Sequence, residues 1–207
     1  MPSLKNPSRM GAARLLARRL TLASMMLALA SCASLLHLPP SRIPEPKLSP
    51  ASFGAAVSLA QRLRFERARV VPNEAPRSLD VLLEINSREV RLAGIAVGQR
   101  VLSLRWDGTT LDVQRHPLLP VQVDPARVLR DVQYAYWPAT MIRDALPPGW
   151  TLQDDASQRR LLEGDLIVLR IDYDAAPPRW DGALRITNSV EGYSLAIQSQ
   201  PQESAAP

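Results

Sequence analysis

Apolar and polar residues alternate with a period of two along much of the chain between residues 51 and 200. In residues 57–66 the large apolar side chains fall on one face and the charged ones on the other, and residues 79–86 repeat this pattern. A third alternating run begins at Val90. Because the side chains of a β-strand point alternately to its two faces, this period predicts strands that each bury one face.

Turn residues join these runs into hairpins. Asp107-Gly108 is a favoured two-residue turn, and with this turn as the loop Leu104 faces Leu111, so that apolar residues meet apolar residues. A second hairpin turns near residues 163–164. The outgoing strand of that hairpin and both strands of a third carry apolar faces: Ile167, Leu169, Ile171 and Tyr173 in the second, and Leu184, Ile186, Tyr193, Leu195 and Ile197 in the third.

A helical segment separates the two groups of strands. Asp124 has the position of an N-cap and Pro125 that of the first helical residue, and apolar residues then recur at helical spacing as far as Tyr136. A second short helix ends before Pro147, since proline cannot continue a helix. The predicted order of about five strands, two short helices and about five strands favours an antiparallel sheet with helices across one side.

The first 31 residues have a different pattern from the rest. A basic stretch is followed by the uncharged apolar run Leu20–Ala30 and by the sequence Leu-Ala-Ser-Cys, which ends at Cys32. This layout is typical of a secretory signal, and the run is shorter than the roughly 20 residues of a transmembrane helix. Leu-Ala-Ser-Cys resembles the lipobox of bacterial lipoproteins, which implies that Cys32 is acylated and begins the mature protein. The alternative is a secreted protein with a free cysteine. A start at Met1 or at Met10 leaves the same signal.

The signal also accounts for the charge of the chain. The sequence has 25 basic and 20 acidic residues, and five basic residues but no acidic one lie in residues 1–31. The remainder is therefore neutral, which removes any global electrostatic case for binding nucleic acid. Cys32 is the only cysteine, so its acylation leaves no thiol for a disulfide, a metal site or a nucleophile.

Five prolines in residues 32–50 exclude a helix or a central strand and predict an extended tether after Cys32. We predict a folded domain at residues 51–200 and a disordered tail at residues 201–207. Ala33 follows the cysteine, and in enteric bacteria an aspartate at that position retains a lipoprotein in the inner membrane. The resemblance therefore implies the outer membrane of a Gram-negative bacterium, with membrane lipid as the partner of the anchor on the periplasmic face.

Several segments together resemble the periplasmic lipoprotein-carrier and outer-membrane receptor superfamily (LolA/LolB). Residues 90–104 are similar to its strand–turn–strand, residues 124–150 to its paired helices and residues 178–199 to its closing hairpin. The resemblance implies a mainly β (α+β) fold. In this fold about ten strands form an antiparallel half-barrel, and two short helices cover the concave side over an apolar cavity.

A second resemblance is to a family of small bacterial lipoproteins of unknown function, often encoded beside aryl-polyene or fatty-acid-synthase-like pathways. It covers about residues 52–199. The segments that carry it are Gly98-Gln99-Arg100, Trp106-Asp107-Gly108, residues 128–133, Trp137-Pro138, residues 146–150 and residues 192–195.

The folded region offers few groups for catalysis. It has no Ser-His-Asp order, no zinc-ligand spacing and no glycine-rich phosphate loop. For its only histidine, His116, we favour a structural role, and for Asp131 an ion pair, with Arg130 or a strand arginine. Two groups of acids are interpreted as loop ends and solvated strand faces: Asp154 with Asp155, and Asp172 with Asp174. We therefore expect a protein that is not an enzyme and uses no cofactor or metal ion.

A lipid site requires no such groups, because each buried methylene contributes about 0.8 kcal/mol. The leading hypothesis is a module that binds or transfers an acyl or polyene lipid, or the acyl chains of a lipoprotein, without covalent chemistry. Its partner is an acyl-chain ligand or a periplasmic carrier protein. The alternatives are a structural or interaction lipoprotein with a filled core and, third, an envelope hydrolase. The candidate cavity lining is formed by strand residues and the helix residues over them: Leu83, Leu92, Leu104, Leu169 and Ile171, covered by Val132, Met141 and Ile142.

The apolar turn at Ile95, Ala96 and Val97 is a separate candidate. By its resemblance to the receptor, it occupies the turn that meets the membrane or incoming acyl chains. An exposed apolar tip suits that role. The alternative is a buried strand end.

Overall fold

The computed structural model describes the second of two compact units of the chain, residues 41–207, in four stretches: residues 43–67, 77–120, 123–174 and 178–202. The predicted signal, Cys32, the first part of the tether and the chain from residue 203 onward lie outside the described residues. Pro201, predicted to begin the tail, is instead the last residue of a strand.

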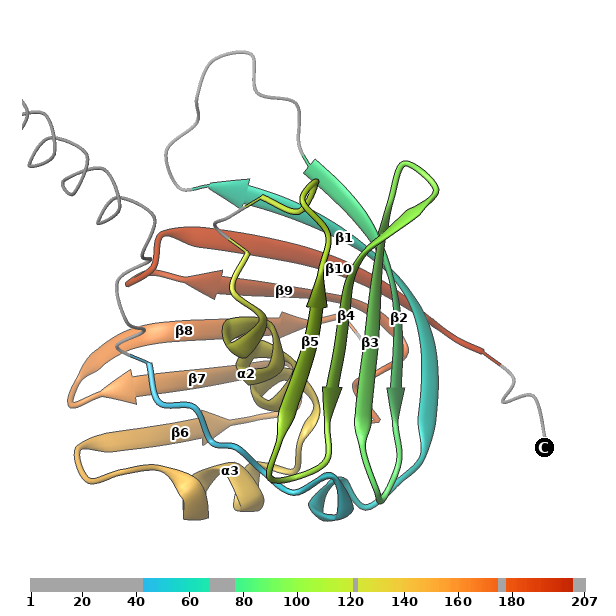
Figure 1. Cartoon of the computed structure of the whole chain (residues 1–207). Helices are drawn as coiled ribbons and strands as arrows, with labels where there is room; N and C mark the ends of the chain where they lie inside the picture. The colour runs from blue at the N-terminus through green and yellow to red at the C-terminus, as the bar shows by residue number, and fades with distance from the viewer. Residues whose placement is uncertain (1–42, 68–76, 121–122, 175–177, 203–207) are drawn as a thin grey trace, which may run out of the picture. The chain divides into compact units, whose positions relative to one another are not determined.

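Within the described residues, ten antiparallel strands form a single sheet (Figure 1). The strands are β1 (Val57–Arg67), β2 (Arg77–Ile85), β3 (Val90–Ala96), β4 (Gln99–Trp106), β5 (Leu111–Arg115), β6 (Trp150–Asp154), β7 (Gln158–Glu163), β8 (Leu166–Tyr173), β9 (Gly182–Asn188) and β10 (Tyr193–Pro201). Their order across the sheet is β5-β4-β3-β2-β1-β10-β9-β8-β7-β6. The first and last strands pair at the centre, so each half of the chain forms one wing of the sheet.

Two helices, α2 (Pro125–Tyr136) and α3 (Ala139–Ala145), connect the wings, and α2 lies inside the curve of the sheet (Figure 1). At the start of α2 the Asp124 carboxylate accepts a hydrogen bond from the Ala126 backbone N–H at 3.0 Å, as expected for an N-cap. The predicted fold class is confirmed. The architecture is mainly β, an open antiparallel sheet with two short helices, and is consistent with a half-barrel.

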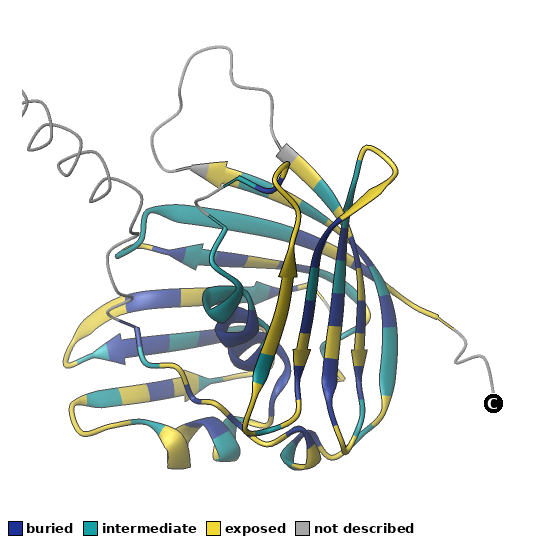
Figure 2. Ribbon diagram, in the orientation of Figure 1, coloured by how far each residue is buried: buried dark blue, intermediate teal, exposed yellow. Residues whose placement is uncertain are grey.

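The hydrophobic core lies between the inner face of the sheet and α2 (Figure 2). In β3 the buried and less buried positions alternate, as the period of two predicts. Tyr134 of α2, Ile142 of α3 and Trp137 between the two helices are completely buried. These large side chains fill much of the concave side.

Residues 43–53, called the strap below, cross the concave side before β1 begins (Figure 1). Ile43, Leu48 and Phe53 are buried in the core cluster, and a short 3₁₀-helix, η2 (Pro50–Phe53), ends the strap. This corrects the predicted domain boundary at residue 51. The prolines exclude an α-helix, although Pro50 begins a 3₁₀-helix, and they do not prevent the apolar residues between them from packing on the core.

The register of the β4–β5 hairpin differs from the predicted one by two residues. Its loop has four residues, Asp107–Thr110, and Leu104 faces Val113. The Asp107 carboxylate accepts hydrogen bonds from the backbone N–H groups of both loop threonines, at 2.9 and 2.8 Å, which favours the longer loop. A shift of two residues keeps every side chain on its face, so the predicted faces remain correct.

The other two predicted hairpins are β7–β8 and β9–β10, and the second of these pairs as predicted. In β7–β8 the register shifts between Leu161 and Leu162. Val168 is buried as a result, whereas Ile167 is exposed, which corrects its predicted place on the buried face. An extra residue at a β-bulge reverses the alternation at that point.

Candidate functional site

The residues of the predicted cavity lining come together in the core on the concave side. Leu83, Leu92 and Leu104 are neighbours across β2, β3 and β4. In the other wing, Leu169 and Ile171 lie on β8. The three helix residues pack against the same cluster, Ile142 fully and the other two in part: Ile142, Val132 and Met141. The structure therefore brings all the predicted lining residues into one packed core.

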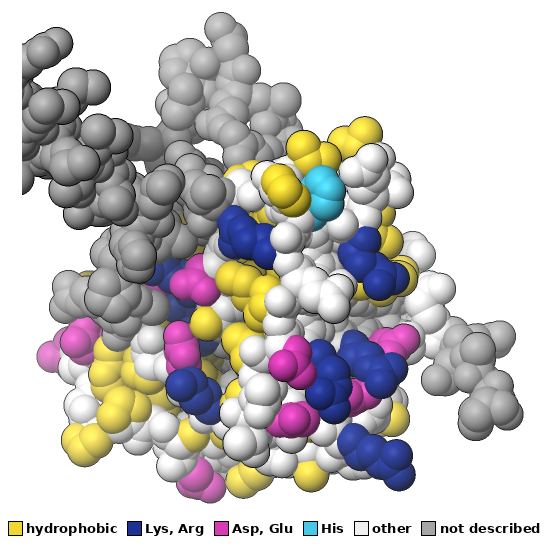
Figure 3. Space-filling model, in the orientation of Figure 1, with side chains coloured by type: hydrophobic (Ala, Val, Ile, Leu, Met, Phe, Trp, Pro, Cys, Tyr) yellow, Lys and Arg dark blue, Asp and Glu magenta, His cyan; other side chains and the backbone are white. Residues whose placement is uncertain are grey.

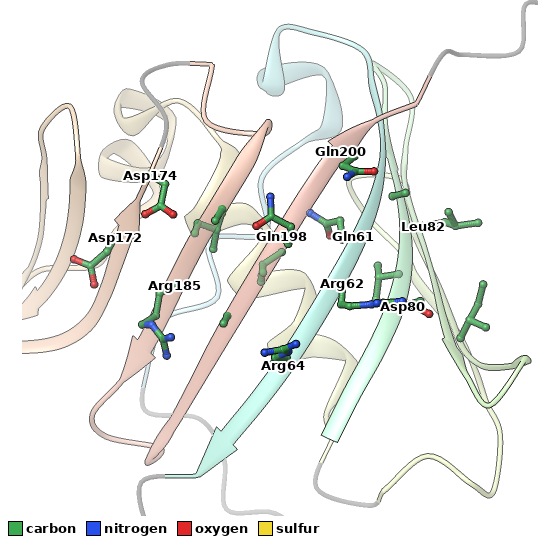
Figure 4. A pocket seen from close by; sticks show the side chains of 17 residues that line it. Gln61, Arg62, Arg64, Asp80, Leu82, Asp172, Asp174, Arg185, Gln198 and Gln200 are labelled. Carbon is green, nitrogen blue, oxygen red and sulfur yellow. The ribbon is translucent and has the colours of Figure 1, made fainter. Parts of the chain in front are cut away.

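A groove of about 1000 Å³ lies on the outer face of the sheet, over β1, β2 and β8 to β10 (Figure 4). Arg64 on β1 and Arg185 on β9 flank Ala196 of β10, which pairs with both. The charged lining residues balance, three arginines against three aspartates: Arg62, Arg64, Arg185, Asp80, Asp172 and Asp174. The groove is thus the solvated face of a curved sheet, without a net charge that would select a charged ligand.

A buried polar network joins α2 to the β9–β10 hairpin. The Arg130 side chain is 0% exposed and donates to Glu191 Oε1 and Oε2 at 2.9 and 3.0 Å. It also donates to Asp131 Oδ1 at 3.0 and 2.9 Å and to the Tyr193 hydroxyl at 2.9 Å. The Tyr193 hydroxyl donates in turn to Asp131 Oδ2. The predicted ion pair between Asp131 and Arg130 is confirmed.

Burial sets the electrostatics of this network. It raises the pKa of Asp131, and the Arg130 charge and the Tyr193 hydrogen bond oppose that rise. It also raises the pKa of Tyr193, and the neighbouring Asp131 charge adds to the effect. Because the oxygens of both carboxylates accept hydrogen bonds, the network holds α2 on the hairpin and fixes its orientation.

A second buried cluster closes the C-terminal end of α2. Arg159 Nη1 donates to the carbonyl oxygens of Tyr134 and Trp137 at 2.6 and 2.9 Å, and so satisfies carbonyls that the helix itself leaves unpaired. Arg159 Nε donates to Asp154 at 2.9 Å, and Arg179 donates to the same carboxylate at 2.6 Å. Burial opposes these contacts, but the two arginines lower the pKa of Asp154. Asp154 therefore has a structural role at the end of β6.

The loop after β5 is a tight turn that presents one leucine to solvent. His116 Nδ1 accepts a hydrogen bond from the Leu118 backbone N–H at 3.1 Å. Leu119 is buried in the core, and Arg115 donates to the carbonyl oxygens of Leu119 and Pro120. These contacts hold the loop in place. Leu118 is 64% exposed. Sequence analysis did not single out Leu118; an apolar pair between two prolines after a strand was the available signal.

The turn between β3 and β4 consists of Val97 and Gly98, because Ala96 pairs with Gln99. Val97 has φ 50° and is 99% exposed, whereas Ile95 on β3 is half-buried. The alternative of a buried strand end is therefore wrong for Val97. A β-branched residue with positive φ is unusual, and such outliers are found at functional sites.

In the part of the chain that the structure describes, no three histidine, cysteine, aspartate or glutamate side chains come close enough to hold a metal ion. The helices of that part are too short or too polar to cross a membrane.

The described residues form a ten-stranded antiparallel sheet with two short helices, consistent with a half-barrel. This architecture is compatible with the fold of the LolA/LolB superfamily. The chain belongs to the DUF3261 family of proteins of unknown function, whose model matches residues 58–201. No curated protein matches the chain.

Proposed function

We propose that this protein is an outer-membrane lipoprotein, anchored through Cys32, that binds or transfers acyl chains without covalent chemistry. One observation carries the proposal: Val97 is 99% exposed in a left-handed conformation at the tip of a hairpin. The Leu-Ala-Ser-Cys sequence at the end of the predicted signal supports the anchor. The open antiparallel sheet, with helices on its concave side, supports an acyl-chain role by its compatibility with the LolA/LolB fold.

The conformation of Val97 has a cost that a bound lipid would offset. A left-handed backbone costs a residue with a Cβ roughly 1–2 kcal/mol, and asparagine or glycine is favoured in a two-residue hairpin turn. The exposed isopropyl group of Val97 gains no free energy of burial that would offset this cost. Burying a valine side chain against an acyl chain contributes about 1.5 kcal/mol or more, which is of the same size as the strain.

In this proposal the acyl chain lies against the concave face, beside the predicted lining. Those residues pack against one another, so the chain must displace a covering element. Of the two helices, α3 is held by fewer buried residues, because Ile142 is its only one and α2 has seven. Burying a 16-carbon chain contributes up to roughly 12 kcal/mol, against about 3 kcal/mol at most for exposing one isoleucine. The free energy of burying a full acyl chain therefore exceeds the free energy lost when Ile142 is exposed by movement of α3.

The packed core also supports the second candidate, an interaction lipoprotein that carries no ligand. Tyr134 and Trp137 are completely buried on the concave side, and Arg130 fixes α2 to the β9–β10 hairpin. In that case the domain acts as a rigid module in an envelope assembly. Native mass spectrometry of the mature protein after membrane exposure distinguishes the two, because a ligand-free mass favours the interaction protein.

The direct test compares Val97→Glu with Thr109→Glu, a matched change in an exposed turn at the other end of β4. The measurement is transfer of a pyrene-labelled phospholipid between donor and acceptor vesicles. We expect Val97→Glu to lose transfer and Thr109→Glu to retain it. Equal transfer by the two variants, with unchanged thermal unfolding, contradicts the proposal.

A further inference from the structure

The strand pairings place the described turns at two opposite ends of the sheet. The β3–β4 turn, the loop after β5, the β7–β8 turn and the β9–β10 turn share one end, called the apolar end below: residues 97–98, 116–120, 164–165 and 189–192. The β2–β3, β4–β5 and β6–β7 turns share the other end. Because the sheet is curved, the apolar end follows a rim along the edge of the half-barrel (Figure 1).

The exposed apolar side chains are distributed unequally between the two ends. Of the six large ones among the described residues, four lie at or next to the turns of the apolar end: Val97 at 99% exposed, Leu118 at 64%, Leu166 at 60% and Ile167 at 40%. The other two lie within strands: Leu82 and Val113. The described turns of the opposite end hold none of the six. Two of these turns are led by the aspartates Asp107 and Asp155, which accept hydrogen bonds from the loop N–H groups.

The apolar tips are fixed outward and do not fold back on the domain. Leu118 follows a turn held by the His116 ring and by the guanidinium of Arg115. Val97 stands at the tip of a hairpin that is paired to its last residues. Leu166 begins β8 directly after the two-residue turn. Isolated aliphatic tips on separate turns suit insertion among lipid chains, whereas the cores of protein interfaces favour contiguous, aromatic-rich patches.

The chain segments that carry two of these tips, Val97 and Leu118, have basic residues and no acidic ones. Residues 95–102 and 113–120 contain Arg100 and Arg115 but no aspartate or glutamate. Asp80 on β2, which pairs with Ile95 across the sheet, forms an ion pair with Arg62. Figure 3 shows apolar side chains beside the histidine, with basic side chains on either side of them. Basic groups beside apolar tips complement the anionic headgroups of a bilayer.

We propose that the apolar end is a bilayer-docking surface, which seats Leu118 and Val97 among lipid chains and brings Leu166 and Ile167 to the membrane interface. The proposal rests on the lipid anchor of the proposed function, but not on acyl-chain binding. The anchor keeps a bilayer within reach, since the 11 residues from Cys32 to Arg42 span at most about 40 Å when fully extended. Linking the domain to the surface raises the effective concentration of the two for each other.

The test uses the acylated mature protein in vesicles. Acylation consumes Cys32, so one introduced cysteine is the only reactive thiol. Two variants place a fluorophore at the apolar end, Leu118→Cys and Ile167→Cys, and two exposed-turn controls place it at the opposite end, Thr109→Cys and Ala156→Cys. Quenching by a phospholipid with a nitroxide on its acyl chain reports contact with the bilayer interior.

We expect quenching at residues 118 and 167 and only background quenching at residues 109 and 156. We also expect quenching at residue 118 to increase when phosphatidylglycerol is added to phosphatidylcholine vesicles, and Arg100→Glu to abolish that increase. Equal quenching at the two ends overturns the proposal. Shielding of residues 118 and 167 from water without lipid quenching also overturns it, and would assign the surface to a protein partner. A Cys32 thiol that reacts in the unaltered mature protein instead shows that the anchor itself is absent.

Discussion

The side-chain amide of Gln133 pairs with both backbone groups of Leu48, 85 residues earlier in the chain. Gln133 Oε1 accepts from the Leu48 N–H at 3.2 Å, and Gln133 Nε2 donates to the Leu48 carbonyl at 3.1 Å. Trp106 Nε1 donates to the same carbonyl at 2.8 Å. One glutamine therefore binds the strap to α2 in the way that a neighbouring strand would bind it.

Replacing Gln133 should release the strap. Gln133→Ala leaves the buried Leu48 N–H without its partner, and an unsatisfied buried group costs about 1–3 kcal/mol. We expect a loss of stability of that size in urea unfolding, and faster proteolysis within residues 43–53. Gln114→Ala, on the exposed strand β5, is the control. A Gln133 variant as stable as the control would show that the strap does not depend on this pairing.

Removing Arg130 should be more damaging than removing the whole charged network. Arg130→Met leaves Asp131 buried without its adjacent cation and removes the closer cation from Glu191, which also faces Arg127 at 3.8 Å. Breaking a buried ion pair in this way costs about 3–5 kcal/mol. Adding Asp131→Asn and Glu191→Gln removes the uncompensated charges, and we expect it to restore part of the loss. Denaturant unfolding of the two variants measures the difference. If the triple variant is the less stable one, the network contributes net stability as an ion cluster.

The same variant should change how stability depends on pH. Burial raises the pKa of Asp131 in the folded state, so the folded protein holds this proton more tightly than the unfolded chain does. Stability from this group is therefore full below the unfolded pKa of about 3.9 and falls as the pH rises through the folded value. Without the opposing Arg130 charge, the Arg130→Met variant should lose more stability than the unaltered protein as the pH rises above the unfolded pKa of Asp131.

Asp154 should show the opposite sign. Hydrogen bonds from Arg159 and Arg179 lower its pKa despite burial, so its contribution is full above the unfolded pKa of about 3.9 and is lost as the pH falls through the lower folded value. Asp154→Asn should therefore reduce stability at neutral pH and flatten the acid limb of the unfolding curve. Asp144→Asn, at an exposed site on α3, provides the control. Identical acid limbs for the two variants would rule out the assignment.

Relieving the turn at Val97 should stabilise the domain. Asparagine tolerates the left-handed conformation and is favoured before glycine in this turn, so Val97→Asn is expected to gain about 1 kcal/mol in urea unfolding. The same change should weaken lipid transfer, because it removes the apolar tip. Higher stability together with lower transfer is expected if the strained backbone at residue 97 serves to place an apolar side chain against lipid. A destabilised Val97→Asn protein would show that the valine is not strained.

Acylation of Cys32 is tested in the cell. Globomycin blocks the peptidase that cuts before a lipid-modified cysteine, so the precursor should accumulate in treated bacteria. Cys32→Ser should give an uncut precursor that no longer responds to the compound. A mature form that persists unchanged in treated cells would exclude the lipoprotein assignment and, with it, the anchor on which the docking surface depends.

Local pattern determined the elements of this fold. The period of two fixed the strands and their faces, and Asp124-Pro125 fixed the start of α2, because these signals depend on neighbouring residues only. The pairing of Asp131 with the adjacent Arg130 was accessible for the same reason. The turn at Val97 was also visible, as an apolar residue before a glycine between two strands.

Tertiary structure decided what distant segments do to one another. The central β1–β10 pairing, the docking of Leu48 on Gln133 and the arrival of Glu191 at Arg130 join residues far apart in the chain. No local propensity encodes such contacts, because they depend on how the curved sheet brings its two wings together. The unequal distribution of exposed apolar side chains between the two ends of the sheet has the same origin. Val97, Leu118 and Leu166 are unrelated positions in the sequence, and only the alternating strand directions place them at one end.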